Sequence, residues 1–314
     1  MPTTTSTRPR AAGAWRGLAL VCLAGAIWGT IGPAVDVVDD RSALSVWVVG
    51  GYRALAAVLA LLLAVVLTGR LPRCRRLLSA HLARTVGVGA LTATFMVLFF
   101  VAVVTIGVSV ATVVALGWAP VLLQLIHVVR ARRSPPPGEV LTVVAAVVGL
   151  LLISLAGGGD PDATRPVLGV VTALASGSAY ALSAELVGPL NEHDGLTVAT
   201  VTMTVAAVVL VSVGAVVGGA RGATLTTPDA TTWLLVVYLG VVTMALAYVL
   251  LYAGLRSTPS RTAVVATLLE PVTAVAIAVL LLGERLSPAG AVGALLIVAA
   301  IASLGLRPAE PPPQ

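Results

Sequence analysis

The sequence predicts an all-α polytopic membrane protein with ten transmembrane helices, arranged as two inverted five-helix repeats. The prediction rests on the composition, on the spacing of the apolar segments and on a pair of prolines that recurs at one offset. Of the 314 residues, 58% are hydrophobic and 10% are charged, whereas soluble globular proteins carry about 25% charged residues. The mean hydropathy of +1.05 indicates that most of the chain lies in lipid.

Ten apolar segments follow one another along the chain, joined by short loops. Each is close to the roughly 20 residues that a helix needs to cross a bilayer. The predicted spans are residues 16–35, 43–67, 85–106, 109–129, 138–156, 166–188, 196–218, 233–255, 261–282 and 287–306.

The two ends of the chain are more polar than the spans. The small residues Ala24-Gly25-Ala26 are similar to a signal-peptide cleavage site, but the apolar run continues to Val35, which favours an uncleaved first helix. The proline-rich carboxyl end cannot continue a helix. The predicted organisation is a disordered cytoplasmic tail at 1–14, five-helix repeats at 16–156 and 166–306, and a Pro-rich cytoplasmic tail at 307–314.

All 19 basic residues are arginines, and their distribution predicts the orientation of the protein. With the amino terminus inside, Arg53 lies within a span, four arginines lie in outer loops, and the other fourteen lie in inner segments. Cytoplasmic loops are enriched in basic residues, so both termini are expected in the cytoplasm. The four outer arginines are Arg41, Arg165, Arg221 and Arg285.

An internal repeat is detectable at an offset of 151 residues, which aligns Pro120 with Pro271 and Ser109 with Ser260. Matches between alanines or valines are weak evidence for a repeat in a chain this rich in both. The main evidence for the alignment is therefore the pair of prolines that it places at the same position in two apolar spans. Five spans is an odd number, so the second repeat enters the membrane from the opposite side. In such inverted repeats, interrupted helices at corresponding positions point to a site near the midplane.

The ninth span contains two residues that are costly at membrane depth, Glu270 and Pro271. A carboxylate at the centre of a spanning helix costs about 2.5–3.5 kcal/mol on insertion scales. A proline there frees a backbone carbonyl and bends or breaks the helix. The pair therefore predicts a helix that faces other helices or a cavity rather than lipid.

Four motifs resemble a known family. They are Leu269-Glu270-Pro271 in the ninth span, Gly283-Glu284-Arg285-Leu286 in the following turn, Trp28-Gly29 in the first span and Arg53 in the second. On these residues nearly the whole chain resembles EamA-type carriers of the drug/metabolite transporter superfamily. The resemblance implies ten helices in two inverted repeats, with alternating access to a central cavity lined by spans one, three, four, six, eight and nine. The first repeat has Ala119 where the second has Glu270, so a charged site would be asymmetric.

Five residues are candidates for coupling or gating. Glu270 either accepts a proton, because burial favours its neutral form, or pairs with a cationic substrate group, or serves as a structural carboxyl beside Pro271. Pro120 and Pro271 are predicted to bend the fourth and ninth helices, as hinges or as static kinks. Arg53 either joins an ion pair with Glu185 or Glu270 or contacts an anionic substrate group. Glu185 is either an interfacial carboxylate near the cytoplasmic end of the sixth span or an acid within the cavity.

Six residues are candidates for substrate binding, and ordinary packing is the alternative for each. Aromatic residues make up only 4% of the chain, so those on the spans that the resemblance assigns to the cavity are weighed individually. An amide within lipid must find a partner, which adds one glutamine to the set. The candidates are Trp28, Trp118, Gln124, Tyr180, Tyr248 and Tyr252.

The sequence contains no motif typical of an enzyme. It lacks a P-loop and the G-x-S-x-G and H-E-x-x-H patterns, and Cys22, Cys74 and the three histidines show no metal-ligand spacing. We therefore expect no catalytic residue, no metal and no cofactor, and transport driven by a gradient or occurring passively.

The predicted function is a secondary transporter that moves a small organic metabolite or drug across the inner membrane, in the direction of export, with proton antiport as the predicted driving force. The alternatives are a non-transporting membrane sensor, a membrane-embedded lipid enzyme, or a passive facilitator on the same scaffold. The expected partners are a small-molecule substrate, the lipid bilayer and protons, with no nucleic acid. A homodimer is left open.

Overall fold

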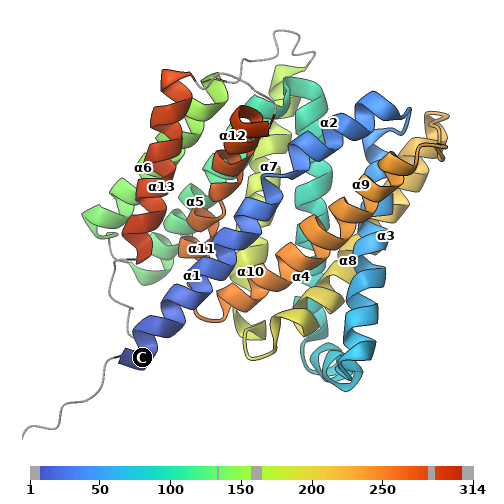
Figure 1. Ribbon diagram of the computed structural model, residues 1–314. Coiled ribbons are helices and arrows are strands. Elements are labelled where there is room, and N and C mark those ends of the chain that lie inside the picture. Colours follow the sequence, from blue (N-terminus) through green and yellow to red (C-terminus); the bar gives the residue numbers. More distant parts are fainter. Residues whose placement is uncertain (1–7, 133, 157–164, 282–286, 306–314) are drawn as a thin grey trace, which may run out of the picture.

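The computed structural model describes residues 8–132, 134–156, 165–281 and 287–305, and this part of the chain folds into a bundle of helices (Figure 1). Ten helical segments are long and apolar enough to cross a membrane, which confirms the predicted fold class. The tails at 1–7 and 307–314 and the turn at 283–286, which entered the predictions above, lie outside the described residues.

Most spans consist of one helix, but three are divided. The first span contains α1 and α2, the eighth contains α9, the π-helix η2 and α10, and the ninth contains α11 and α12. The elements are α1 (Arg8–Trp28), α2 (Ile31–Arg41), α3 (Val46–Leu67), α4 (Leu71–Ile106), α5 (Val108–Ala131), α6 (Pro137–Ala156), α7 (Pro166–Leu186), the short 3-10 helix η1 (Gly188–Leu190), α8 (Gly195–Ala220), α9 (Ala230–Gly240), η2 (Val241–Leu246), α10 (Ala247–Leu255), α11 (Ser260–Ala266), α12 (Leu269–Leu281) and α13 (Pro288–Gly305).

Local sequence accounts for several helix starts. Proline suits the first turn of a helix, where its missing N–H is not needed, and prolines begin α6, α7 and α13. Helix α1 is described from Arg8 onward, with Pro9 in its first turn. Helix α4 begins before the predicted third span and has a kink at His81 (φ −136°, ψ 35°).

The packing of the helices reveals the internal repeat. Helix α4 packs against α7 and α8, and the eighth span packs against α1 and α3 in the same manner. Helix α5 packs against α7, and the ninth span packs against α1. In the repeat, the first, second, third and fourth spans correspond to the sixth, seventh, eighth and ninth. Each of these contacts therefore has a counterpart between the corresponding spans. The pairs α3–α8 and α6–α13 map onto themselves, and they form opposite edges of the molecule in Figure 1.

The pair α6–α13 is joined by a close contact between two glycines. A Cβ atom on Gly293 would lie 2.5 Å from the carbonyl oxygen of Gly149, and a Cβ on Gly149 would lie 2.6 Å from the carbonyl oxygen of Gly293. Small residues are the usual means by which membrane helices approach this closely.

The helix starts follow the same offset closely. Gly89 and Gly240, which both pack against a neighbouring backbone, are 151 positions apart, as are the first residues of α6 and α13. The first residues of α5 and α11, Val108 and Ser260, are 152 apart, and one residue is the usual variation of helix ends.

Replacing Gly293 with alanine should destabilise the protein by about 1–3 kcal/mol, the usual cost of overpacking, because the added Cβ would meet the backbone of Gly149. The midpoint of thermal unfolding in detergent measures the effect. Gly219→Ala on α8 is the matched control, since no atom lies within 4 Å of its added Cβ. Equal unfolding midpoints for the two variants would contradict the close contact between α6 and α13.

Candidate functional site

Three spans are interrupted close to one another, around Trp28. The first span breaks at Gly29 and Thr30, between α1 and α2, and the ninth breaks at Thr267 and Leu268, between α11 and α12. The eighth carries the six-residue π-helix η2. The spans related to these by the repeat are α7, α4 and α5. Among them α4 has its kink at His81, near its start and ahead of the predicted third span, so the interruptions within the spans belong to one side of the bundle.

Two glycines bring the broken first and ninth spans into backbone contact. A Cβ on Gly25 would lie 2.9 Å from the carbonyl oxygen of Thr267, and a Cβ on Gly29 would lie 2.5 Å from that of Glu270. Both distances are well inside the separation at which carbon and oxygen normally touch, so larger residues would push the helices apart. These contacts hold the start of α12, and with it Glu270, against the first span.

Trp28 connects the first span to the π-helix. Its indole Nε1–H donates a hydrogen bond of 2.8 Å to the carbonyl oxygen of Thr243. The amide of Ala247 donates to Val242, five residues earlier, rather than to Thr243. The indole therefore supplies a donor to a carbonyl that the π-helix has deprived of one of its usual partners. Such a carbonyl must be satisfied inside the protein at membrane depth.

Trp28 is also part of a cluster of aromatic rings. Its ring centroid lies 5.3 Å from that of Tyr248 and 6.5 Å from that of Tyr180. Tyr248 lies 5.9 Å from Tyr252, and Phe95 lies 5.1 Å from Tyr180. These separations are those of favourable aromatic pairs. Four of the six residues predicted to bind substrate are thus brought together, and Phe95 joins them.

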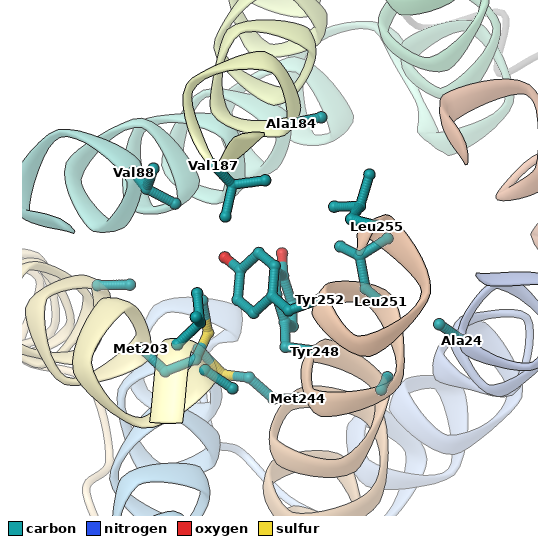
Figure 2. Close-up of a cluster of buried hydrophobic side chains, with 14 of the residues drawn as sticks. Ala24, Val88, Ala184, Val187, Met203, Met244, Tyr248, Leu251, Tyr252 and Leu255 are labelled. Carbon is teal, nitrogen blue, oxygen red and sulfur yellow. The ribbon is translucent and has the colours of Figure 1, made fainter. Parts of the chain in front are cut away.

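Two of the three tyrosine hydroxyls of the cluster are buried with polar partners. The Tyr180 hydroxyl lies 2.9 Å from the Thr267 hydroxyl, at the break in the ninth span. The Thr202 hydroxyl donates to that of Tyr252 at 3.4 Å. Figure 2 shows Tyr248 and Tyr252 projecting from α10 into the largest group of buried apolar side chains. In this conformation the rings are in contact with one another.

Arg53 and Glu270 bring charge to this centre. Arg53 is on α3 and only 8% exposed, and it interacts electrostatically with Glu270 and Tyr248. Of the two carboxylates considered as its partner, Glu270 is therefore the one in reach. Glu270 is in the first turn of α12, where the helix dipole favours a negative charge. Within the described part of the chain, neither side chain forms a hydrogen bond or a close ion pair.

The remaining predicted site residues are not members of the aromatic cluster. The Trp118 indole donates to the Ser178 hydroxyl at 2.9 Å, and the Gln124 amide donates to Glu139 at 3.3 Å. Glu185 accepts from Arg130 at 2.6 Å. Pro120 lies inside the single helix α5, whereas Pro271 lies in the first turn of α12, directly after the break.

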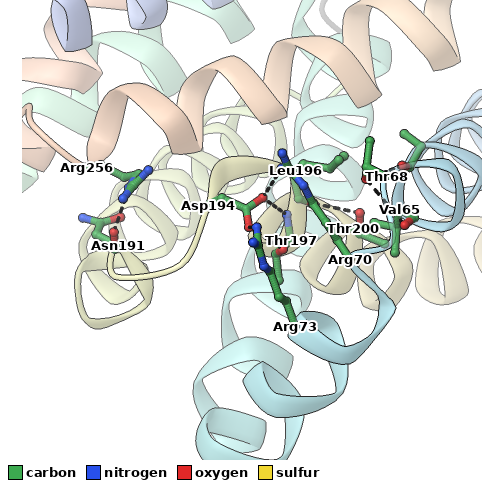
Figure 3. A network of polar contacts seen from close by, with 11 residues as sticks. Val65, Thr68, Arg70, Arg73, Asn191, Asp194, Leu196, Thr197, Thr200 and Arg256 are labelled. Carbon is green, nitrogen blue, oxygen red and sulfur yellow. Dashed lines mark hydrogen bonds and ion pairs between the residues drawn. The ribbon is translucent and has the colours of Figure 1, made fainter.

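The contacts of Glu185 and Glu139 belong to one end of the bundle, which we call the Arg-rich end. Figure 3 shows a further part of this end, where Asp194 accepts hydrogen bonds from Arg70 at 2.7 Å and Arg73 at 3.4 Å. Arg256 donates to the carbonyl oxygen of Asn191 at 3.1 Å. The loops beside Arg73 and Arg256 thus lie on one face of the molecule.

The pKa of the Asp194 carboxyl lies below its ordinary value. Burial, the largest effect, raises the pKa, but hydrogen bonds from Thr197 and the neighbouring Arg70 guanidinium together outweigh it. Because the folded-state pKa is lowered, this carboxylate stabilises the fold above the ordinary pKa of aspartate. That contribution is lost as the pH falls through the lowered value.

Several central features carry no recognisable sequence signal. The π-helix lies in the run Val-Val-Thr-Met-Ala-Leu, whose apolar composition does not distinguish it from an ordinary helix. Thr243 and Thr267 are two of many threonines on the spans. Phe95 could have been included, because it is one of three phenylalanines and lies on the third span, which the family resemblance assigns to the cavity.

The comparisons with known proteins agree with this architecture. The EamA-like transporter family matches the chain twice, over residues 15–155 and 166–306. The chain belongs to the EamA-like transporter family. As an EamA-family protein it is a multi-pass membrane transporter with ten spans.

Two relatives place this EamA-family chain among known proteins. It is 27% identical over 223 residues to the uncharacterized transporter YwfM of Bacillus subtilis (strain 168), a match that covers 67% of this chain and 69% of YwfM. It also shares its fold with a protein of known crystal structure at a TM-score of 0.72 and 20% identity. That match covers 95% of this chain and 99% of the other.

Replacing Trp28 with phenylalanine should destabilise the protein by about 1–3 kcal/mol, the cost of leaving a buried acceptor without its donor. The ring remains, but the Thr243 carbonyl loses the indole N–H. Thermal unfolding in detergent measures the effect. Trp118→Phe is the matched control, because its indole donates to the partly buried hydroxyl of Ser178. An equal or larger loss in the control would show that the Trp28–Thr243 bond is unimportant.

Proposed function

We propose that this EamA-family transporter is a secondary carrier of the inner membrane that exports a small organic compound by alternating access. The Arg-rich end faces the cytoplasm in this proposal, as the positive-inside rule favours, and both termini lie there. The observation that carries the proposal is a helical hairpin that lies between two backbone interruptions and makes polar contacts at its tip.

The hairpin consists of α10, α11 and the turn between them, residues 247–266. At one end of it is the π-helix η2, and at the other is the break at Thr267 and Leu268. Interruptions of this kind are where membrane helices bend. The hairpin carries Tyr248 and Tyr252, so its movement would open or close the aromatic cluster.

Polar contacts hold the tip of this hairpin to the opposite side of the bundle. Ser260 donates to Glu185 at 2.6 Å, and Arg261 donates to Glu139 at 3.2 Å. The Asn191 amide donates to the carbonyl oxygen of Leu255 at 2.8 Å. Glu139 lies on α6 in the first repeat, so the Arg261 contact joins the second repeat to the first. Glu185 lies on α7 of the second repeat, and it also accepts from Arg130 of the first. They favour a conformation that is closed at the Arg-rich end.

The other end of the molecule has no equivalent charges at these positions. The residues that correspond to Ser260, Glu185 and Glu139 at the 151-residue offset are Ser109, Ala34 and Gly290. Closure of that end therefore cannot use counterparts of the two carboxylate contacts. This difference supports two closed conformations that are held by different contacts, as alternating access around a midplane site requires.

Glu270 is the group proposed to couple transport to protons. It is the acidic side chain in electrostatic reach of Arg53, and it lies at the break where the hairpin meets α12. Intramembrane carboxylates that face the bundle interior commonly relay protons in transporters. A passive facilitator on the same scaffold would not need this group.

The double variant Glu139→Gln/Glu185→Gln should shift the protein toward a conformation open at the Arg-rich end, because the hairpin loses its two carboxylate contacts. A cysteine at Val264, which is 1% exposed, reports the opening in a background with Cys22 and Cys74 replaced by serine. We expect its reaction with a membrane-impermeant maleimide to accelerate several-fold from the Arg-rich side. Glu192→Gln, an exposed neighbour with the same charge change, should leave the rate unchanged. An unchanged rate in the double variant would contradict the gating role.

Glu270→Gln should abolish proton movement that accompanies transport while leaving substrate exchange intact, because the amide cannot take up a proton. Proteoliposomes that contain a trapped pH-sensitive dye are exposed in turn to organic acids, amines and neutral metabolites. Counterflow of each active compound is then measured without a proton gradient. Undiminished proton flux in the variant would remove Glu270 from the mechanism, and counterflow without any proton flux in the unaltered protein would favour the passive facilitator.

A further inference from the structure

We propose that the substrate is a small organic anion with an apolar or aromatic body, and that it binds to the Arg53 guanidinium with linked protonation of Glu270. This inference rests on the proposed carrier function, since it names the substrate class of the same central site. It also specifies whether the proton and the substrate move in the same direction or in opposite directions, which the proposed carrier function alone does not determine.

The first step concerns the unsatisfied donors of Arg53. A guanidinium has five N–H donors in a planar fork and stays charged in proteins. Arg53 is only 8% exposed and its guanidinium nitrogens are not fully buried, yet no described side chain or carbonyl accepts a hydrogen bond from them. A buried charge without hydrogen bonds is costly. A carboxylate or phosphate matches the fork with two parallel hydrogen bonds, so it is the ligand chemistry that would satisfy this group.

The second step concerns what surrounds the guanidinium. Tyr248 interacts with Arg53 and is in ring contact with Trp28 and Tyr252. Rings of this kind offer apolar faces to a ligand body. The combination of one cationic fork and several aromatic faces suits an anion attached to a flat or apolar body. A free inorganic anion would use the fork and leave the rings without a role.

The third step concerns charge balance. The groups that face Glu270 are Arg53 on α3, Tyr180 on α7 and Tyr248 on α10. Phenolic hydroxyls ordinarily titrate near pH 10, so they are neutral at physiological pH. The site therefore carries no net charge when Glu270 is ionised and one positive charge when it is protonated. An anion binds better to the second state, so its binding draws a proton from water onto the Glu270 carboxylate.

This linkage makes the anion and the proton travel together. Because the coupling of two binding equilibria is reciprocal, the factor by which the bound proton raises the affinity for the anion equals the factor by which the bound anion raises the affinity for the proton. A cationic substrate would instead compete with the proton for Glu270 and give the antiport predicted from the sequence. Export of an anion by this route would run on its own outward concentration gradient and would carry one proton with it.

Four ligands with a common ring separate these cases by isothermal titration calorimetry on the purified full-length protein: benzoate, phenyl phosphate, benzylammonium and benzamide. We expect the two anions to bind. Their affinity should weaken between pH 6 and pH 8 by up to about tenfold per pH unit, the limit for one linked proton. Titrations in buffers of different ionisation enthalpy should show proton uptake on benzoate binding.

Variants test the two groups separately. Arg53→Gln should weaken benzoate binding by about 30-fold or more, the usual loss when one partner of a buried charged pair is removed. Arg53→Lys should lose less, because it keeps the charge but not the fork. Glu270→Gln should bind benzoate without dependence on pH. Arg84→Gln, an exposed arginine at the start of the third span, should behave like the unaltered protein.

Three outcomes would overturn the inference: binding of benzylammonium in preference to benzoate, unchanged benzoate affinity in Arg53→Gln, or failure of both anions to bind the unaltered protein. If Arg53→Gln does not fold, the ligand series, the pH dependence and the proton uptake of the unaltered protein still decide. Binding is measured without transport, so intact benzoate binding with no counterflow would refute the carrier function and leave the anion site standing.

Discussion

Every backbone group that is freed at membrane depth must find a partner inside the protein, and this constraint organises the centre of the molecule. The break in the first span, the π-helix in the eighth and the break in the ninth lie together because they complement one another. The Trp28 indole bonds to a carbonyl of the π-helix, and the Tyr180 hydroxyl meets Thr267 at the ninth-span break. Glycines 25 and 29 allow the approach that brings these partners within reach. A break isolated in lipid would have none of these partners.

The two repeats have diverged in their backbone more than in their packing. Contacts between spans still follow the two-fold relation. The irregular backbone, Glu270 and the charged hairpin contacts, by contrast, involve the second repeat with no counterpart at the related positions. Local changes in backbone and charge can therefore give one half of a duplicated carrier a different role without altering the fold around it.

The sequence predicts the scaffold well because hydropathy, arginine distribution and span number depend on composition and order along the chain. The ten spans and the duplicated architecture were accessible in this way. The grouping of Trp28, Tyr180, Tyr248 and Tyr252 followed instead from the resemblance to EamA-type carriers, which assigns their spans to the cavity. The π-helix was not, because Val241–Leu246 has the composition of any apolar helix, and its register depends on contacts made by distant spans. Trp118 and Gln124 were predicted on the correct spans, but their direction around the helix could not be predicted in a span whose apolar residues show little periodicity.

Charge balance links the site to the movement that transport requires. A carrier with a permanently charged Arg53 must neutralise it whenever the site is closed to water on both sides, because an unpaired charge in a closed, low-dielectric site is costly. Ionised Glu270 meets that requirement in the empty carrier, and an anion with protonated Glu270 meets it in the loaded one. An anion bound beside ionised Glu270 would leave a net negative charge, and protonated Glu270 without an anion would leave a positive one. The two neutral combinations are therefore the ones that can close, and a single arginine beside a single titratable carboxyl is sufficient to couple the substrate to the proton.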